Sequence, residues 1–498
     1  MIFKLSKKAK NTLTKKILQL TSILLLFIVS FSSIAATYWF NPNKHMTTSD
    51  LHNYYQGAYG FVDGFENQDP LESLDDMAKQ NINLVILYGT NYSVKPKSEF
   101  RKDAVLEKQF KKVDRYLAHA HSLGIQVIMP VWRIPKNMEQ VPYMNAGELD
   151  TVIRYIKRYT DNPTVIGWYM MDEPILRLES VGKKAPEYFQ KYIIPAFDTL
   201  TEALDEYDTN NKLRFGVFER YNKGKYGLEN GARILIERYL TAWGHDRYPF
   251  VKRSPKEFQN IYYVIRNFYA LDFFVRSIRK PFLFVGQAQS SDANPDWQQR
   301  LPTEREFLIQ QIYPMLLMSD AKSRYHLGNL VWAFGVMRAT PAGRKFLAEV
   351  YSPGKQLIDF ISPGIANGRI KDISQDLTKP SYIEEKAIKA GLYDIPQDSL
   401  IFQNKAWHPH PFRGKKMAVA IATKGGHNHN FSFTYPGKVN SVETPSAALN
   451  HICRIENFRQ QYNPNKQETL LQMQIMPLCP TVLIFDAQMQ RKNVGNGI

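Results

Sequence analysis

The sequence has little cysteine and comparatively few acidic residues. Two cysteines in 498 residues exclude a disulfide-dense scaffold, a cysteine-based zinc cluster and an iron–sulfur site. With 44% hydrophobic and 22% charged residues, the chain has enough apolar side chains for a globular fold and is not of the disordered class. Lys and Arg outnumber Asp and Glu by 64 to 47. No zinc-finger, RNA-recognition or helix-turn-helix signature accompanies this charge, so we expect no nucleic-acid partner.

Several enzyme motifs are also missing. The sequence has no His-Glu-x-x-His, Walker or Gly-x-Ser-x-Gly element, which sets aside a zincin, an NTPase and an α/β-hydrolase. The paired histidines His408/His410 and His427/His429 lie in expected loops, far in sequence from any cluster of other ligands. We therefore expect no bound metal and no cofactor.

The N-terminus is typical of an export segment. The first 36 residues hold six lysines and no acidic residue, and an apolar run follows the lysines at 17–29. Ser33 and Ala35 are small residues two apart, as a signal peptidase site requires. The alternative is an uncleaved anchor, since ~20 apolar residues span a bilayer and 17–40 is long enough. We assign 1–40 to a signal peptide or signal-anchor helix and 41–56 to a linker.

Either alternative places the remainder outside the cytoplasm, because the lysines hold the N-terminus inside. We expect a periplasmic, cell-surface or secreted protein, or one anchored in the inner membrane by residues 17–40.

Residues 57–365 alternate short apolar runs with helical patterns. The expected strands read as near-continuous apolar runs, as strands of a parallel sheet with two buried faces do. Eight such strand–helix units predict a (β/α)₈ TIM barrel of the α/β class. The expected strands are 58–63, 84–88, 126–132, 165–171, 213–218, 239–243, 282–287 and 330–334.

Residues 366–498 differ in character. Helical periodicity fades, and strand-like runs at 399–403, 417–423, 430–435, 470–475 and 481–485 are separated by turn signals. This pattern predicts an antiparallel β-sandwich. Both cysteines, Cys453 and Cys479, fall in this region, and an oxidising compartment would allow them to form a disulfide.

Polar and aromatic side chains gather after the expected barrel strands. In a (β/α)₈ barrel the carboxyl ends of the strands carry the chemistry. Carboxylates, amides and Arg can bind sugar hydroxyls, and aromatic faces can stack on a sugar ring. The candidate substrate-binding residues are Asp63, Tyr88, Trp132, Arg133, Asp172, Glu219, Trp243, Tyr248, Gln287, Gln289 and Trp332.

The fourth expected strand ends in Asp172-Glu173-Pro174. This triplet resembles the strand-four signature of the clan of retaining glycosidases built on (β/α)₈ barrels, in which the glutamate is the acid/base catalyst. The resemblance implies that Glu173 is the general acid of a glycoside hydrolase and that Asp172 binds substrate. It covers the barrel as architecture but only about eight residues as motif.

The seventh expected strand departs from that clan, because Gln287 and Gln289 stand where its glutamate nucleophile would be. A neutral amide cannot form a glycosyl ester. Asp246 or Glu219 could serve instead, and a separation of ~6.5–9.5 Å from Glu173 would indicate inversion. Alternatively, an N-acetyl sugar supplies its own nucleophile, or the barrel binds glycans without cleaving them.

Asp246 lies in an Asp-x-Tyr-Pro sequence that ends with Tyr248 and Pro249. Together with the strand-seven Gln-Ala it is similar to a set of glycosidase-like barrels that combine these two elements with Asp-Glu-Pro. We therefore take Glu173 and Asp246 as the candidate catalytic pair, acting on a polysaccharide or oligosaccharide outside the cytoplasm. The alternative is a non-catalytic glycan-binding or scaffold protein on a decayed hydrolase barrel.

Overall fold

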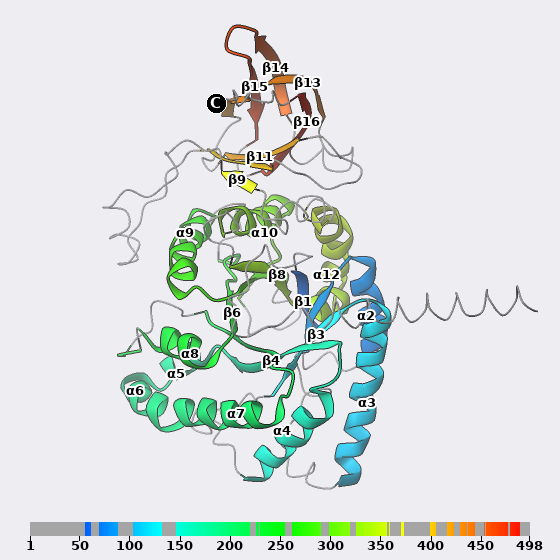
Figure 1. Cartoon of the computed structure of the whole chain (residues 1–498), viewed down its shortest axis with the longest axis vertical. Helices are drawn as coiled ribbons and strands as arrows, with labels where there is room; N and C mark the ends of the chain where they lie inside the picture. Colours follow the sequence, from blue (N-terminus) through cyan, green and yellow to red (C-terminus); the bar gives the residue numbers. More distant parts are fainter. Residues whose placement is uncertain are drawn as a thin grey trace, which may run out of the picture. The chain divides into compact units, whose positions relative to one another are not determined.

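The fold is described from a computed structural model (Figure 1). The residues that it describes are 55–60, 69–87, 103–131, 146–219, 226–228, 230–253, 261–289, 298–318, 325–355, 358, 370–372, 399–404, 416–422, 429–435, 437–443, 453, 455–476 and 479–488. The predicted export segment lies outside these residues. No helix within them is both long and apolar enough to cross a membrane.

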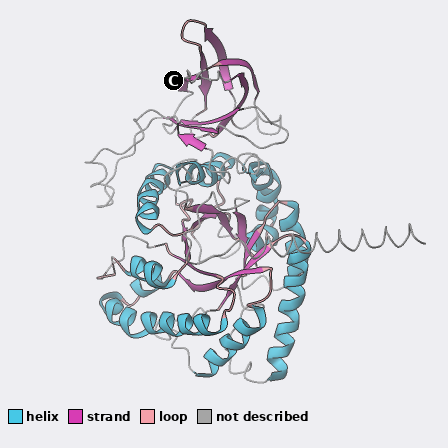
Figure 2. Ribbon diagram, in the orientation of Figure 1, coloured by secondary structure: helices cyan, strands magenta, loops and turns pink. Residues whose placement is uncertain are grey.

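Eight parallel strands close into a barrel that helices surround (Figures 1 and 2). The strands pair in chain order, and β1 pairs with β8 to close the sheet. The predicted (β/α)₈ barrel is thereby confirmed. The strands are β1 (Tyr55–Tyr59), β2 (Leu84–Ile86), β3 (Gln126–Pro130), β4 (Val165–Asp172), β5 (Leu213–Val217), β6 (Ala242–Asp246), β7 (Phe282–Gln287) and β8 (His326–Trp332).

Helical segments follow the strands. The α-helices of the described residues are α2 (Pro70–Lys79), α3 (Asp103–Ser122), α4 (Ala146–Tyr159), α5 (Pro174–Glu179), α6 (Ala185–Tyr188), α7 (Ile194–Tyr207), α8 (Gly231–Tyr239), α9 (Ile261–Ile278), α10 (Glu304–Met318), α11 (Phe334–Ala339) and α12 (Pro341–Phe346). Shorter 3₁₀ or π segments are η4 (Gly182–Lys184), η5 (Phe189–Ile193) and η6 (Leu347–Tyr351).

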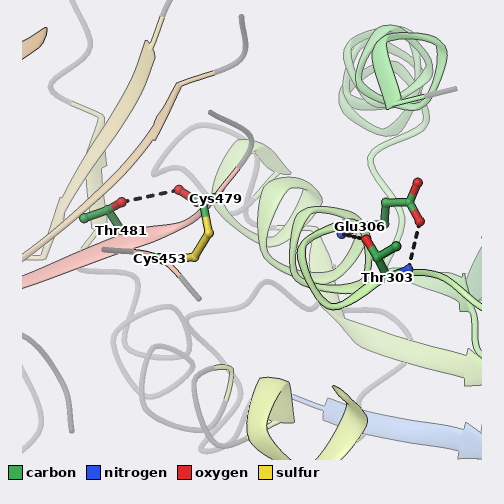
Figure 3. The surroundings of a disulfide bond; sticks show 5 residues. All are labelled: Thr303, Glu306, Cys453, Cys479 and Thr481. Atoms are coloured by element: carbon green, nitrogen blue, oxygen red, sulfur yellow. Dashed lines mark hydrogen bonds between the residues drawn. A yellow bond between two sulfur atoms is a disulfide. The ribbon is translucent and has the colours of Figure 1, made fainter. Parts of the chain in front are cut away.

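Side chains satisfy the exposed backbone groups at helix ends. Before α10, the Thr303 amide donates to Glu306 Oε2 at 2.8 Å and the Glu306 amide donates to Thr303 Oγ1 at 3.4 Å (Figure 3). This reciprocal capping fixes where the helix begins. At the other end of a helix, Lys280 Nζ donates to three carbonyls that end α8, those of Ile236, Glu237 and Leu240.

Three strands are displaced from their predicted positions. β1 begins at Tyr55, two residues before the predicted start of the barrel, and ends at Tyr59. β6 covers Ala242–Asp246 rather than 239–243, since α8 extends through Tyr239. β8 covers His326–Trp332 rather than 330–334, because Phe334 begins α11. At β6 and β8 the apolar run continues into the neighbouring helix, so periodicity does not mark the boundary.

The barrel interior is filled by side chains. Tyr59 of β1 and Tyr169 of β4 meet across it, with ring centroids 6.2 Å apart. The Leu330 side chain of the paired strand β8 lies over Gly57, since a Cβ on Gly57 would be 2.3 Å from it. The interior is therefore a packed core.

The C-terminal region is antiparallel β-structure. Its strands are β9 (Ile370–Asp372), β10 (Ser399–Asn404), β11 (Lys416–Ala422), β12 (His429–Tyr435), β13 (Lys438–Glu443), β14 (Ile455–Asn463), β15 (Glu468–Ile475) and β16 (Thr481–Gln488). They form a five-stranded sheet, β13-β16-β11-β10-β9, and a three-stranded sheet, β12-β15-β14. The face-to-face packing of a sandwich stays a prediction.

Sequence reasoning missed three of these strands, β9, β13 and β14. Most of the β14 side chains are exposed, so its sequence has no alternation of apolar and polar residues. Its neighbour β15 does alternate, and that strand was predicted.

Cys453 and Cys479 form a disulfide (Figure 3). Their Cα atoms are 5.4 Å apart, within the range that a disulfide permits. Cys479 is fully buried, and its carbonyl accepts a hydrogen bond from Thr481 Oγ1. The bridge joins residues 26 positions apart and restrains the segment that contains β14 and β15.

Replacing both cysteines by serine should destabilise the C-terminal region. The chain-entropy cost of a loop of this length corresponds to about 3–4 kcal/mol. Denaturant unfolding of the oxidised protein, the reduced protein and the double serine variant measures it. Equal midpoints for all three would contradict a stabilising bridge.

Candidate active site

The carboxyl ends of the barrel strands bring most of the candidate residues together. Four candidates, Asp63, Tyr88, Trp132 and Arg133, lie outside the described residues. The others are described and come from β4 to β8 or the residues directly after them: Asp172, Glu173, Glu219, Trp243, Asp246, Tyr248, Gln287, Gln289 and Trp332.

A bulge in β4 changes the direction of Asp172. The pairing of β4 with β5 shifts register between Tyr169 and Met171, and both Met170 and Met171 join the hydrophobic cluster. Because two successive residues take the outer face, Tyr169 and Asp172 share the inner face. Strict alternation alone would have separated the Asp172 and Glu173 carboxyl groups.

Glu173 takes a left-handed backbone conformation. Its φ is 46° and its ψ is 47°, a region that residues other than glycine rarely occupy. The Glu173 amide donates to the Val217 carbonyl at 2.9 Å, and Pro174 begins α5 directly afterwards. These contacts hold a strained turn, of a kind that concentrates at functional sites.

The carboxyl groups of Glu173 and Asp246 are hydrogen-bonded to each other. Burial, the Asp246 charge and the Asp172 charge, in that order, raise the pKa of Glu173 well above its ordinary value. Burial also raises the pKa of Asp246. The pair therefore retains one proton at pH values where free carboxyl groups are ionised, with Glu173 as donor and Asp246 as acceptor.

Asp246 keeps one carboxylate oxygen available. Its side chain is almost fully buried, with 3% exposed, and among the described residues no donor reaches Oδ1. The Tyr248 phenol also hydrogen-bonds Asp246, and burial raises the phenol's pKa so that it stays protonated. A buried acceptor without a donor is costly, and at Oδ1 it is an atom ready for a substrate.

Asp172 is held by two side chains. Tyr169 donates its hydroxyl proton to Oδ1 at 2.5 Å, and Arg177 Nη2 donates to Oδ2 at 2.6 Å. Arg177 Nε also reaches the Asp172 carbonyl at 2.8 Å. The Tyr169 hydroxyl lies 3.3 Å from that of Tyr59. A chain of polar contacts thus runs from β1 through β4 to α5.

Glu219 forms an ion pair at the rim. Arg247 Nη1 lies 2.8 Å from Glu219 Oε1, and both side chains are mostly buried. The ion pair joins the segment after β5 to the segment after β6. The Glu219 charge still contributes to the raised pKa of Asp246.

Trp332 and Trp243 occupy different environments. Trp332 is partly exposed at the end of β8, and its ring lies 4.8 Å from that of Tyr59. Trp243 is fully buried and packs against Phe274 of α9 and Phe282 of β7. Trp332 therefore lies at the carboxyl end of β8 next to Tyr59, and Trp243 lies between the sheet and α9. Trp243 is a core residue, because its position in β6 turns it away from the barrel interior.

The glutamines after β7 also differ from each other. Gln287 is fully buried, and its amide bonds the backbone of Phe250 and Arg300. It connects the segments that follow β6 and β7 rather than facing a ligand. Gln289 is 3% exposed, and its Oε1 accepts no hydrogen bond from the described residues. Of these two glutamines, only Gln289 has a side-chain oxygen that no donor of the described residues reaches.

Three residues of the network were missed by sequence reasoning: Tyr59, Tyr169 and Arg177. Both tyrosines lie in runs that read as buried strand. Their hydroxyl groups could have indicated a polar site, because a buried phenol needs a polar partner. Arg177 follows Glu173 by four residues, which places it one helical turn away.

No cluster of three or more His, Cys, Asp or Glu side chains suited to a metal ion occurs among the described residues. Glu173 instead hydrogen-bonds Asp246, and Asp172 accepts from Tyr169 and Arg177. The arrangement is suited to moving a proton.

No family model and no curated protein matches the chain. Solved structures do. One is a GH5_18 variant from Bifidobacterium longum subsp. longum in complex with Manb1-4GlcNAc, with TM-score 0.40 and 11% identity, covering 62% of this chain and 79% of that one. Another is a β-glucosidase from Thermotoga maritima in complex with azafagomine, with TM-score 0.37 and 12% identity, covering 58% and 83%. The barrel assignment itself rests on the strand order of this chain.

Replacing Asp246 by asparagine should stabilise the protein at neutral pH. Groups whose folded pKa is raised contribute stability below their unfolded pKa, and that stability is lost as the pH rises through the folded pKa. Removing the buried charge should therefore raise Tm more at about pH 8 than at about pH 5. One unit of pKa shift corresponds to ~1.4 kcal/mol, or a few degrees of Tm.

Thermal unfolding at both pH values tests this expectation. Asp205→Asn is the matched control, since the Asp205 side chain is 63% exposed. A lower Tm for Asp246→Asn at both pH values would contradict the expectation that the buried charge of Asp246 destabilises the fold.

Proposed function

We propose that the protein is a glycoside hydrolase in which Glu173 is the general acid and Asp246 the nucleophile. The observation that carries the proposal is the buried carboxyl pair, in which the pKa of Glu173 is raised and Oδ1 of Asp246 accepts from no donor of the described residues. An acid catalyst needs a pKa near the working pH, and a nucleophile needs an available oxygen.

The hydrogen bond that links the Glu173 and Asp246 carboxyl groups favours the covalent route. Carboxyl groups in direct hydrogen-bond contact leave no room for a water molecule between them. An inverting enzyme separates its carboxyl groups by ~6.5–9.5 Å, and a retaining enzyme by about 5–5.5 Å. Among the alternatives drawn from the sequence, a retaining reaction with Asp246 in place of the strand-seven glutamate fits this contact best.

In the first step, substrate entry replaces the carboxyl–carboxyl contact by a hydrogen bond from Glu173 to the glycosidic oxygen. Glu173 gives its proton to that oxygen as the C–O bond breaks, and the alcohol leaves. Asp246 Oδ1 bonds to the anomeric carbon and forms a glycosyl ester.

In the second step, the Glu173 carboxylate takes a proton from water, whose oxygen attacks the anomeric carbon. The ester bond then breaks and its electron pair returns to Asp246. The pair is left as it began, with Glu173 protonated.

The aromatic residues support a sugar as substrate. Trp332 is partly exposed beside Tyr59 at the end of β8, and an aromatic face at the mouth of a barrel can stack on a sugar ring. The available Gln289 Oε1 can accept a hydrogen bond from a sugar hydroxyl.

One observation favours the non-catalytic alternative. Gln287, the residue that ends β7, uses its side-chain amide to hydrogen-bond the backbone of neighbouring segments. A barrel that had lost a strand-seven nucleophile could keep the glycan and lose the reaction. In that case a glycan binds but no bond is cleaved.

Glu173→Gln should lower kcat by about 10²–10⁴-fold, because an amide cannot supply the proton. A glycan-panel hydrolysis screen followed by kinetics on the best substrate measures the loss. Glu237→Gln is the matched control, since its side chain is 49% exposed on α8. Full turnover by Glu173→Gln would show that another residue is the acid.

The product's anomeric configuration, followed by ¹H NMR during turnover, distinguishes the two mechanisms. Retention supports Asp246 as nucleophile, and Asp246→Asn should then abolish formation of the glycosyl ester. Inversion would assign Asp246 to activation of water instead.

We also propose export by the N-terminal segment, on its lysines and the apolar run that follows. Residues 1–45 fused to a reporter that is active only outside the cytoplasm should give signal. The same fusion with the apolar run interrupted by two arginines is the control. Folded but inactive reporter from the first fusion would contradict the proposed location.

A further inference from the structure

Asp172 directly precedes Glu173, and each of its carboxylate oxygens accepts a hydrogen bond. Tyr169 holds one carboxylate oxygen and Arg177 holds the other, at 2.5 and 2.6 Å. The carboxylate is mostly buried, with 11% of the side chain exposed. The family resemblance assigns this position to substrate binding, yet neither oxygen is left open to a sugar hydroxyl in the way that Oδ1 of Asp246 is.

The contacts of Arg177 also fix the backbone. Besides the carboxylate, the guanidinium binds the Asp172 carbonyl, and the Arg177 amide donates to the Glu173 carbonyl at 3.1 Å. One side chain thus joins the carboxylate to the turn in which Glu173 is left-handed. Planar bidentate recognition of this kind requires arginine more than lysine.

We propose that Asp172 is a positioning residue: clamped by Tyr169 and Arg177, its fixed negative charge keeps the proton on the Glu173–Asp246 pair, and it does not bind the sugar. This proposal rests on the proposed function for its meaning in catalysis. The clamp itself is a property of the folded site without substrate.

Electrostatics support the geometry. The Asp172 charge raises the pKa of both Glu173 and Asp246, and the Arg177 charge lowers the pKa of Glu173. Removing either charge should therefore move the titration of the pair, in opposite directions. The described titratable or charged groups around the pair are Tyr59 of β1, Tyr169 and Asp172 of β4, Arg177 of α5, Glu219 after β5, and Arg247 and Tyr248 after β6.

Asp172→Asn should move the pH profile of kcat/KM to lower pH by about one unit, the usual effect of one neighbouring charge. The alkaline limb moves because Glu173 loses its proton earlier without the adjacent anion. KM should change less than kcat does at high pH. A raised KM with an unmoved pH profile would overturn the proposal and return Asp172 to sugar binding.

Arg177→Gln should move the alkaline limb to higher pH, because the cation that favours the ionised pair is gone. Arg177→Lys keeps the charge, so the alkaline limb of its pH profile should coincide with that of the wild type. Its kcat should still be lower, because lysine cannot make both hydrogen bonds of the guanidinium to Asp172. Asp205→Asn should leave the profile unchanged. If the alkaline limb of Arg177→Gln moves in the same direction as that of Asp172→Asn, the charges of these residues do not control the protonation of the pair, and the proposal is overturned.

A second measurement does not depend on turnover. Difference infrared spectroscopy follows the carbonyl band of a protonated carboxyl group against pH, and Glu173→Gln identifies the band. In Asp172→Asn the band should vanish about one pH unit lower than in the wild type. A band that titrates identically in both proteins overturns the proposal. If the band shifts but no glycan is cleaved, the effect of Asp172 on the protonation of the pair is supported and the hydrolase proposal fails.

Discussion

The proposed chemistry of the site depends on the hydrogen bond between the Glu173 and Asp246 carboxyl groups. Two carboxyl groups brought together away from water cannot both ionise cheaply, so one proton stays between them. Tyr248 donates to Asp246 of the pair, and Tyr169, Arg177 and Arg247 donate to the neighbouring carboxylates Asp172 and Glu219. The barrel's packed core supplies the rigidity that keeps it in place.

Two local departures from regular geometry bring the Asp172 and Glu173 carboxyl groups to the same side at the end of β4. The bulge in β4 puts Tyr169 and Asp172 on one face, and the left-handed turn at Glu173 brings the next carboxyl to the same side. Either departure alone would leave the carboxyl groups on opposite faces of the strand. Each costs conformational energy, and both are held by the Val217 carbonyl and the Arg177 side chain.

Several features of the site follow from the sequence and several do not. The positions of Glu173 and Asp246 at the ends of β4 and β6 could be read from the order of apolar runs, even though the limits of β6 were misplaced. Trp243 could not be separated from Trp332, because both follow apolar runs. Only the side of the strand distinguishes a core tryptophan from one at the mouth.

The sequence by itself determined the eight-unit barrel, since hydrophobic burial on two faces produces a repeat that the apolar residues display directly. It also determined which polar residues follow each strand. The tertiary structure alone decided which of them touch: that Glu173 contacts Asp246, that Arg247 pairs with Glu219, and that Asp172 is clamped. The first two contacts join residues tens of positions apart, and the clamp joins near neighbours whose directions depend on a register shift and on one unusual φ angle, which composition and spacing do not encode.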